Sequence, residues 1–191
     1  MNADAPIVGP LPALLRRTLR RLGVRATRHV LVVRVPLQSV WVYERRRAAA
    51  GGGYALIQRL RASTSRMGTG QVVNSLRTPL GLHCVAAKVG AGWPVGTVFE
   101  NRLPVGAIGQ GRPHAAIAHR ILRLAGLEPG FNQGGDLDTF RRCIYLHGLA
   151  DEPTLGRPAS RGCIHLAAAD LLPLFDRVGP GTLVWITGVL G

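Results

Sequence analysis

The sequence lacks the features of a disulfide scaffold, a zinc ribbon and a membrane-spanning protein. It has 3 cysteines, and none forms a Cys-x-x-Cys pair, which disfavours zinc-ribbon and thioredoxin-like sites. An odd number of cysteines also disfavours a disulfide framework. No apolar run is long enough to span a bilayer, and the N-terminus shows neither the apolar region nor the cleavage site of a secretory signal peptide.

Lysine and acidic residues are also scarce. Lys88 is the only lysine, so arginine supplies almost all of the positive charge, and the formal net charge is +14. A basic surface attracts polyanions such as nucleic acid, anionic lipid or an acidic wall polymer. GC-rich codon use alone can produce an arginine-rich composition, so we do not take the charge as a sign of function. The charge bears on association with other molecules and not on the fold.

Aromatic residues make up only 5% of the chain, whereas apolar residues make up 47%, enough for a folded core. Glycine (25 residues) and proline (13 residues) are frequent, which favours turns and short strands over long helices. A length of 191 residues suits one domain with a short appendage.

We interpret residues 1–27 as that appendage, a basic N-terminal segment ahead of a domain at 28–191. Its leucines can share one face of a helix while its arginines line another, namely Leu14, Leu15, Leu19 and Leu22 against Arg16, Arg17, Arg20 and Arg21. Such an amphipathic helix could contact a membrane surface, or it could cap the domain.

The rest of the chain predicts a mainly β fold. Strands are expected at residues 29–35, 38–44, 54–60, 82–86, 97–99, 141–147 and 183–186. Residues 114–124 fit a strand or a helix equally well. One helix is expected from residue 167 to Gly179, with Leu171, Leu174, Phe175 and Val178 on its apolar side.

One stretch combines the groups that acyl transfer needs. His147 ends an apolar run, and a polar loop leads from it to Ser160-Arg161-Gly162-Cys163 and His165. A cysteine attacks a carbonyl well only as the thiolate, so it needs a base or a positive field. The base must lie within hydrogen-bond reach, and the oxyanion needs nearby backbone N–H groups.

Several motifs of the chain together closely resemble the L,D-transpeptidase catalytic domain family of bacterial cell-wall enzymes. They are Tyr145-Leu146-His147-Gly148, Ser160-x-Gly162-Cys163, a helix carrying Asp170, Gly181-Thr182-x-Val184-x-Ile186, and Arg77-Thr78-Pro79-Leu80-Gly81. The resemblance spans roughly residues 28–187. It implies a sandwich-like arrangement of mixed sheets, with the nucleophile on a turn that faces the histidine strand and a helix after it.

The resemblance also implies the chemistry and the role of each residue. Cys163 would attack a peptidoglycan stem peptide at the carbonyl before its terminal D-residue, and His147 would act as base and then as acid. The Gly148 carbonyl would orient His147, and amides around Gly162 and Cys163 would form the oxyanion hole. No cofactor and no metal are implied. The expected partners are stem peptides and carbapenem-type inhibitors, with no nucleic acid.

Two positions depart from the family pattern. Many members have histidine where this chain has Arg161, and arginine or asparagine where it has His165. We assign Ser160, Arg161 and His165 to substrate binding. The charge of Arg161 could instead lower the pKa of the Cys163 thiol.

Other functions remain open from the sequence. The same scaffold could hydrolyse its thioester and act as an L,D-carboxypeptidase. Cys163, His165 and His147 could alternatively bind a metal ion, or the arginines could hold a polyanion without catalysis. The family implies the cell envelope as location, although the absence of a visible signal peptide leaves the cytoplasm open.

Overall fold

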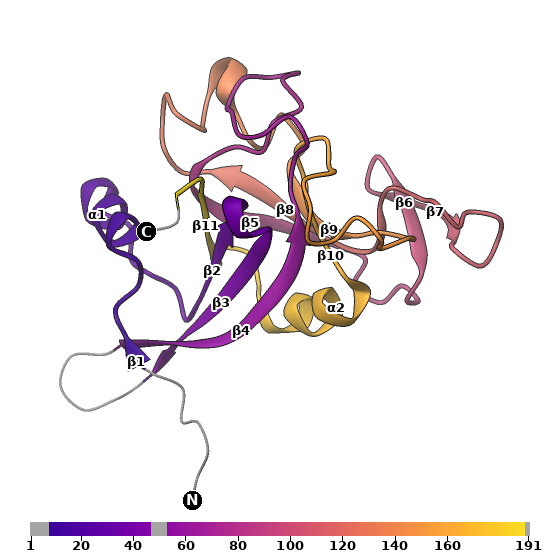
Figure 1. Cartoon of the computed structure of the whole chain (residues 1–191), viewed down its shortest axis with the longest axis horizontal. Helices are drawn as coiled ribbons and strands as arrows, with labels where there is room; N and C mark the ends of the chain where they lie inside the picture. Colours follow the sequence, from indigo (N-terminus) through magenta and orange to yellow (C-terminus); the bar gives the residue numbers. More distant parts are fainter. Residues whose placement is uncertain (1–7, 47–52, 190–191) are drawn as a thin grey trace, which may run out of the picture.

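We describe the chain from a computed structural model, whose described residues are 8–46 and 53–189. The predicted β-rich fold is confirmed (Figure 1). The strands are β1 (Val8–Gly9), β2 (His29–Arg34), β3 (Ser39–Arg46), β4 (Gly53–Ser63), β5 (Gly81–Val89), β6 (Thr97–Glu100), β7 (Leu103–Ala107), β8 (Ala118–Gly126), β9 (Tyr145–Gly148), β10 (Ile164–Leu166) and β11 (Leu183–Thr187). The α-helices are α1 (Ala13–Leu22) and α2 (Ala168–Arg177), and 3-10 turns cover Val35–Leu37 and Gly135–Leu137.

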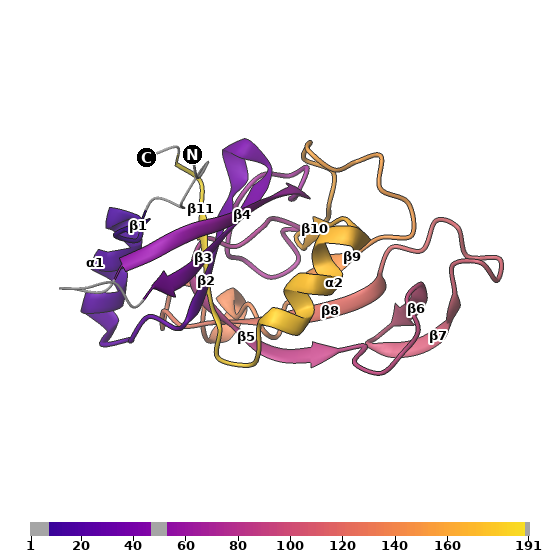
Figure 2. The same cartoon turned by 90° about the horizontal axis from the view of Figure 1, so that it is seen from below.

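The strands form one mixed sheet that curls on itself (Figure 2). Its order is β5-β11-β2-β3-β4-β10-β9-β8-β6-β7. Strand β5 also pairs with β8, which closes the path from β5 to β8, and β6 and β7 extend beyond it. The pairs β10–β9 and β11–β2 are parallel, whereas the other pairs on this path are antiparallel. Because the sheet curls, its halves face each other across a common core.

Helix α2 packs against this core. Its apolar side buries Leu171, Leu174 and Phe175 among the inward-facing side chains of the sheet, such as Leu31 and Leu146. Each fully buried leucine or phenylalanine contributes about 1.5–3 kcal/mol of transfer free energy. The helix thus fixes the interior against which β9 and β10 lie.

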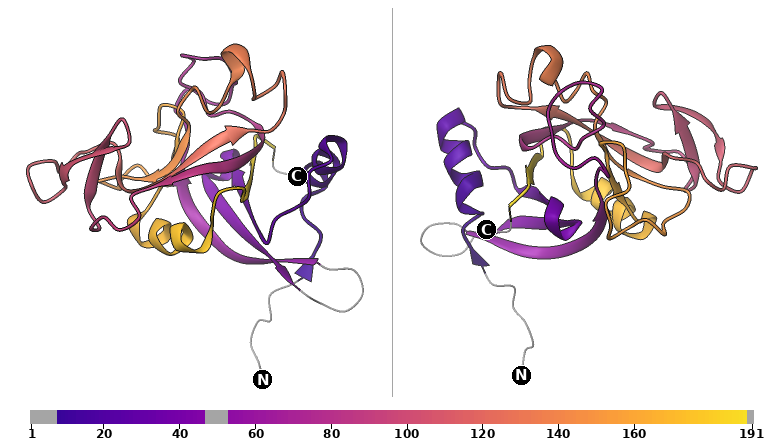
Figure 3. Two further views of the ribbon diagram at one scale, coloured as in Figure 1. Left: turned by 180° about the vertical axis from the view of Figure 1, so that it is seen from behind. Right: turned by 45° about the horizontal axis from the view of Figure 1, so that its top comes forward.

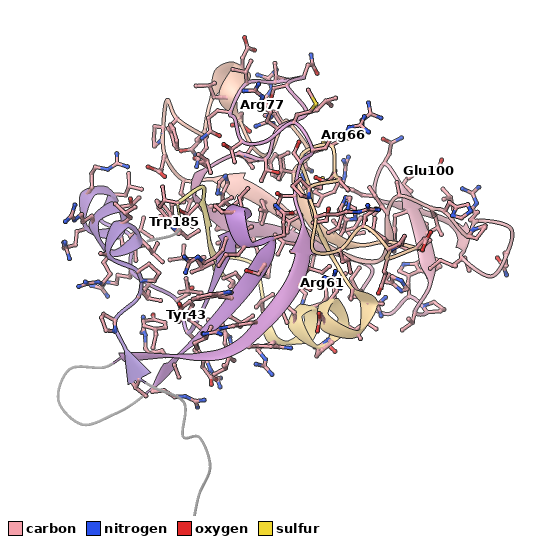
Figure 4. The ribbon with its side chains drawn as sticks, in the orientation of Figure 1. Tyr43, Arg61, Arg66, Arg77, Glu100 and Trp185 are labelled. Atoms are coloured by element: carbon pink, nitrogen blue, oxygen red, sulfur yellow. The ribbon has the colours of Figure 1, made fainter. Side chains whose placement is uncertain are left out.

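Helix α1 covers the outer face of the sheet. Leu15 and Leu19 are buried against a second cluster that includes Val30, Val32 and Trp185, the last of which is labelled in Figure 4. Strand β2 is therefore buried on both faces, which explains its unbroken apolar run. Residues 1–7 of the predicted basic segment lie outside the described residues. Neither described α-helix is long and apolar enough to cross a bilayer.

The β6–β7 hairpin projects from the sheet on the side away from α1, in every view of the molecule (Figures 1 and 3). It is connected to β8 through a single strand position, where Val98 pairs with Ala118. The hairpin also contributes Phe99 to an apolar cluster with Ile121 and Tyr145. This cluster ties the projecting hairpin to the strand that carries His147.

The structure decides one open expectation and corrects two others. Residues 118–126 are a strand, one of the two elements that the sequence allowed there, and the backbone of His119 has a φ of 69° where the register shifts before Ile121. The strand expected at 141–147 begins only at Tyr145, because Cys143 has a φ of 55° and lies in a turn. A short strand, β10, also separates Cys163 from α2.

Candidate active site

Parallel pairing of β9 and β10 brings the predicted site residues together. His147 is the register partner of His165, and Leu146 is the partner of Ile164, so Cys163 directly precedes β10 beside Tyr145. Side chains alternate along each strand, which places Tyr145, His147 and His165 on one face. The rings of His147 and His165 are in contact, with 4.7 Å between their centroids.

The surroundings of His147 select one tautomer. Its Nδ1 lies 2.9 Å from the Gly148 carbonyl oxygen, and a carbonyl can only accept, so Nδ1 carries the hydrogen. Nε2 then keeps its lone pair and can accept a proton. Burial lowers the pKa of His147 to about 4, although the bond to Gly148 opposes this shift.

Cys163 is held as a thiol. Its Sγ donates to the carbonyl oxygen of Cys143 at 3.6 Å, and among the described residues it makes no hydrogen bond with His147. Cys163 keeps some exposed surface, yet protein surrounds its sulfur, and this burial raises the pKa to about 11. The backbone N–H of Tyr145 acts in the opposite direction. Without substrate, the thiol and the imidazole are therefore both neutral at pH 7.

The turn that carries Cys163 is stabilised by Ser160. Its hydroxyl donates to the Cys163 carbonyl oxygen at 2.6 Å and accepts from the Gly162 N–H at 3.2 Å. Gly162 has a φ of +124°, and a Cβ there would lie 3.2 Å from Ile144, so the tight turn needs glycine. Ser160 is only 1% exposed, whereas Arg161 is exposed on the same turn. Ser160 thus supports the turn from inside.

A second segment, residues 65–80, is bonded to this turn through Thr78. The Thr78 hydroxyl donates to the Gly162 carbonyl oxygen at 3.0 Å and accepts from the Ser65 N–H at 3.0 Å. Ser65 also pairs with Ser160 as an isolated parallel bridge. This gives the Thr78-Pro79 motif a structural task, because it fixes the backbone just before Cys163.

We expect Thr78→Val to destabilise both the fold and the site. Valine keeps the volume but leaves the Ser65 N–H and the Gly162 carbonyl unpaired in a buried place, which costs about 1–3 kcal/mol. Chemical unfolding measures this loss, and the acylation rate of Cys163 should fall with it. Thr182→Val, which removes one hydroxyl acceptor distant in sequence from the site, is the control and should keep the acylation rate. An unchanged unfolding free energy for Thr78→Val would contradict this role.

Sequence reasoning missed Arg142. Its guanidinium donates to the carbonyl oxygens of Gly70, Gln71 and Arg77 at 2.6–3.1 Å. These bonds hold the segment of residues 65–80 in place, in which Arg77 is labelled in Figure 4. Burial lowers the pKa of Arg142, and the same positive charge favours the thiolate of Cys163. Nothing in the local sequence distinguishes this arginine from the chain's many others, so only the fold reveals it.

His165 packs against His147. Burial and then the neighbouring His147 lower the pKa of His165 to about 3. Its Nδ1 is buried without a hydrogen-bond partner among the described residues. The structure thus places His165 beside His147.

These histidines should make stability depend on pH. His83 and His147 have a pKa of about 4, and His165 of about 3, all below the ordinary value of 6.5. The unfolded chain binds more protons, so stability is fully present above pH 6.5 and falls as the pH drops towards 4. Each histidine contributes a slope of about 1.4 kcal/mol per pH unit in that range.

Urea unfolding at pH 7, 5.5 and 4.5 measures this slope. His165→Asn should lower it by about 1.4 kcal/mol per pH unit, the contribution of one such histidine. Equal unfolding free energies at pH 7 and 4.5 would show that these imidazoles titrate normally in the folded state.

The described residues contain no group of three or more His, Cys, Asp or Glu side chains that could hold a metal ion. The set Cys163, His147 and His165 is therefore no such group in this geometry. The arrangement instead combines a thiol directly before β10 with a buried imidazole on β9 whose Nε2 has no hydrogen-bond partner among the described residues.

The fold and the site define a mainly β protein that carries an imidazole on one strand and a thiol directly before the neighbouring parallel strand. The model of the L,D-transpeptidase catalytic domain (YkuD) family matches residues 28–186, and the chain belongs to this family. The resemblance seen in the sequence motifs is thereby confirmed. No curated protein matches the chain in sequence.

Solved structures share this fold at low sequence identity. The Bdellovibrio bacteriovorus protein Bd1075 is 17% identical with a TM-score of 0.55, and the match covers 85% of this chain and 48% of that one. An L,D-transpeptidase from Mycobacterium smegmatis is 15% identical with a TM-score of 0.47, covering 84% of this chain and 59% of that one. L,D-transpeptidase 3 from Mycobacterium tuberculosis, solved with a faropenem-derived adduct, is 18% identical with a TM-score of 0.48, covering 84% and 60%. The chain thus spans about half to three fifths of these proteins.

Proposed function

We propose that the chain is a cysteine L,D-transpeptidase domain that acts on peptidoglycan stem peptides. Its Cys163 sulfur forms a thioester at the carbonyl before the terminal D-residue, and that residue leaves as a free amine. An amine of a second stem, or water, then releases the acyl group. The observation that supports this most is the β9–β10 pairing, which sets Cys163 opposite Tyr145, two residues before His147, within a family match over residues 28–186.

The neutral starting pair dictates how protons move in this proposal. His147 Nε2 takes the thiol proton as the sulfur attacks, and the imidazolium then gives it to the leaving amine. The Tyr145 N–H and the Arg142 charge favour negative sulfur during attack. In the second half-reaction His147 takes a proton from the incoming amine or water, and the departing sulfur regains it.

The oxyanion needs backbone donors beside the sulfur. Because the Gly162 N–H donates to Ser160, we assign the oxyanion to the Cys163 amide rather than to Gly162. Gly162 still contributes by allowing the close backbone approach, and Gly148 by orienting His147. Arg161 is exposed on the turn that carries Cys163 and is available to a substrate.

The products of a defined stem tetrapeptide test this proposal. With an acceptor stem present, transpeptidation gives a cross-linked dimer and free D-alanine; without it, water gives the tripeptide and D-alanine. Release of D-alanine without any dimer would make the domain an L,D-carboxypeptidase. No consumption of the tetrapeptide, and no adduct with a carbapenem, would refute the proposal. The proposed substrate places the site of action in the cell envelope.

A further inference from the structure

The tip of the β6–β7 hairpin holds an arginine in an unfavourable backbone conformation. Asn101 and Arg102 form the two-residue turn, with φ values of 49° and 70°, and Glu100 pairs with Leu103 across it. This left-handed turn favours asparagine at its first position but glycine at its second, where Arg102 stands. Strain of this kind persists where the surroundings or a function maintain it.

The side chain of Arg102 reaches the residues around the nucleophile. Its Nη1 donates to the Tyr145 hydroxyl at 3.0 Å and lies 3.7 Å from the Cys143 Sγ. The Cys143 carbonyl in turn accepts the Cys163 thiol, and the Tyr145 N–H faces the Cys163 sulfur. Arg102 is thus connected to Cys163 through one intervening residue, although it lies at the tip of the projecting β6–β7 hairpin, which is labelled in Figure 1.

The rest of the guanidinium is free to bind a ligand. Among the described residues, Nε and Nη2 of Arg102 have no hydrogen-bond partner, and Arg102 forms no ion pair. The carboxylate closest in sequence, Glu100, is paired with Arg112 instead. An arginine with two free N–H directions is suited to bind a carboxylate in a bidentate manner.

We propose that Arg102 binds the C-terminal carboxylate of the acyl donor and thereby determines specificity for peptides that end in a free D-residue. The inference rests on the proposed function. A terminal carboxylate lies one residue, about 3.5 Å, beyond the scissile carbonyl. That carbonyl is attacked by Cys163, so the carboxylate comes to lie where a group adjoining Cys143 and Tyr145 can reach it.

The test compares a stem tetrapeptide with the same peptide carrying a C-terminal carboxamide. Wild-type protein should have a higher kcat/KM for the acid than for the amide. Arg102→Gln should lower kcat/KM for the acid roughly 10- to 100-fold and leave kcat/KM for the amide almost unchanged. Arg102→Lys keeps the charge but loses the fork, and should retain part of the preference. Arg112→Gln, on the neighbouring loop, should keep the wild-type preference.

Two outcomes would overturn this inference and leave the proposed function standing. Arg102→Gln could keep the wild-type ratio of kcat/KM between acid and amide. Alternatively, it could lose activity on both peptides equally, as expected if Arg102 only attached the hairpin to Tyr145. Loss of the ratio in Arg161→Gln but not in Arg102→Gln would assign the carboxylate to the nucleophile turn instead. Absence of thioester from both peptides in the wild type would refute the proposed function itself, and this inference with it.

Discussion

Cys163→Ala is expected to abolish acyl-enzyme formation and to lower turnover of a stem tetrapeptide by at least about 10⁴-fold. The nearby Ser160 hydroxyl cannot replace the sulfur, because it is buried and engaged with Cys163 and Gly162 backbone atoms. Intact-protein mass spectrometry after incubation with a carbapenem or a tetrapeptide shows the loss directly.

The other two cysteines provide matched controls for this substitution. Cys84→Ala removes a half-buried thiol on β5, and Cys143→Ala removes the thiol nearest the site. Both variants should still gain the adduct, because Cys143 contacts Cys163 through its backbone carbonyl, which alanine keeps. An adduct that persists in Cys163→Ala would disprove the assignment of the nucleophile.

His147→Gln is expected to have the second largest effect, a loss of about 10²- to 10⁴-fold in the rate of acylation at pH 7. The thiol has a pKa of about 11, so without a base only a very small fraction is thiolate at neutral pH. The loss should shrink as pH rises, since hydroxide then replaces the base and the variant's rate follows thiolate formation towards pH 11.

The wild-type profile should differ in shape. With a pKa of about 4, His147 stays neutral and able to accept a proton throughout the neutral range, and the rate should fall only as pH approaches that value. Single-turnover acylation between pH 4.5 and 10, within the range where each variant stays folded, gives both profiles. A loss below tenfold for His147→Gln, with an unchanged profile, would show that another group takes the proton.

A buried histidine outside the site is a control for this effect. His83 also has a pKa of about 4 because of burial, but its ring bonds to Gly81 and to the Thr139 hydroxyl. His83→Gln should lower stability and leave the acylation rate per folded molecule unchanged. The comparison separates proton transfer from the general cost of replacing a buried imidazole.

The sequence predicts the fold well where local patterns are strong. The unbroken apolar run of β2 and the apolar side of α2 indicated those elements, because burial against the core dictates both patterns. Strand β10 has only three residues, too few for any periodicity, and its existence depends on pairing with β9 and β4. The turn at Cys143 was likewise missed, because the alternation of residues 141–147 resembles a strand although the Cys143 N–H bonds to the Phe140 carbonyl within a turn.

The candidate site likewise has features that the local sequence indicates and features that only the folded chain reveals. The order of His147 and Cys163 along the chain suggested the pair, and the Gly148 carbonyl follows from adjacency. The contributions of Arg142, Tyr145 and Arg102 depend on segments that are far apart in sequence and meet only in the folded chain. The shifted pKa values of Cys163 and His147 depend on burial, which the sequence does not encode locally.

The most direct test of this account is the position of the acyl group. Wild-type protein is incubated with a stem tetrapeptide, quenched in acid and digested, and the peptides are analysed by tandem mass spectrometry. We predict a thioester of the tripeptide acyl group on the peptide that contains Cys163, with none on Cys84 or Cys143. An acyl group on either of those cysteines, or turnover of the tetrapeptide without any acyl group on Cys163, would contradict the account.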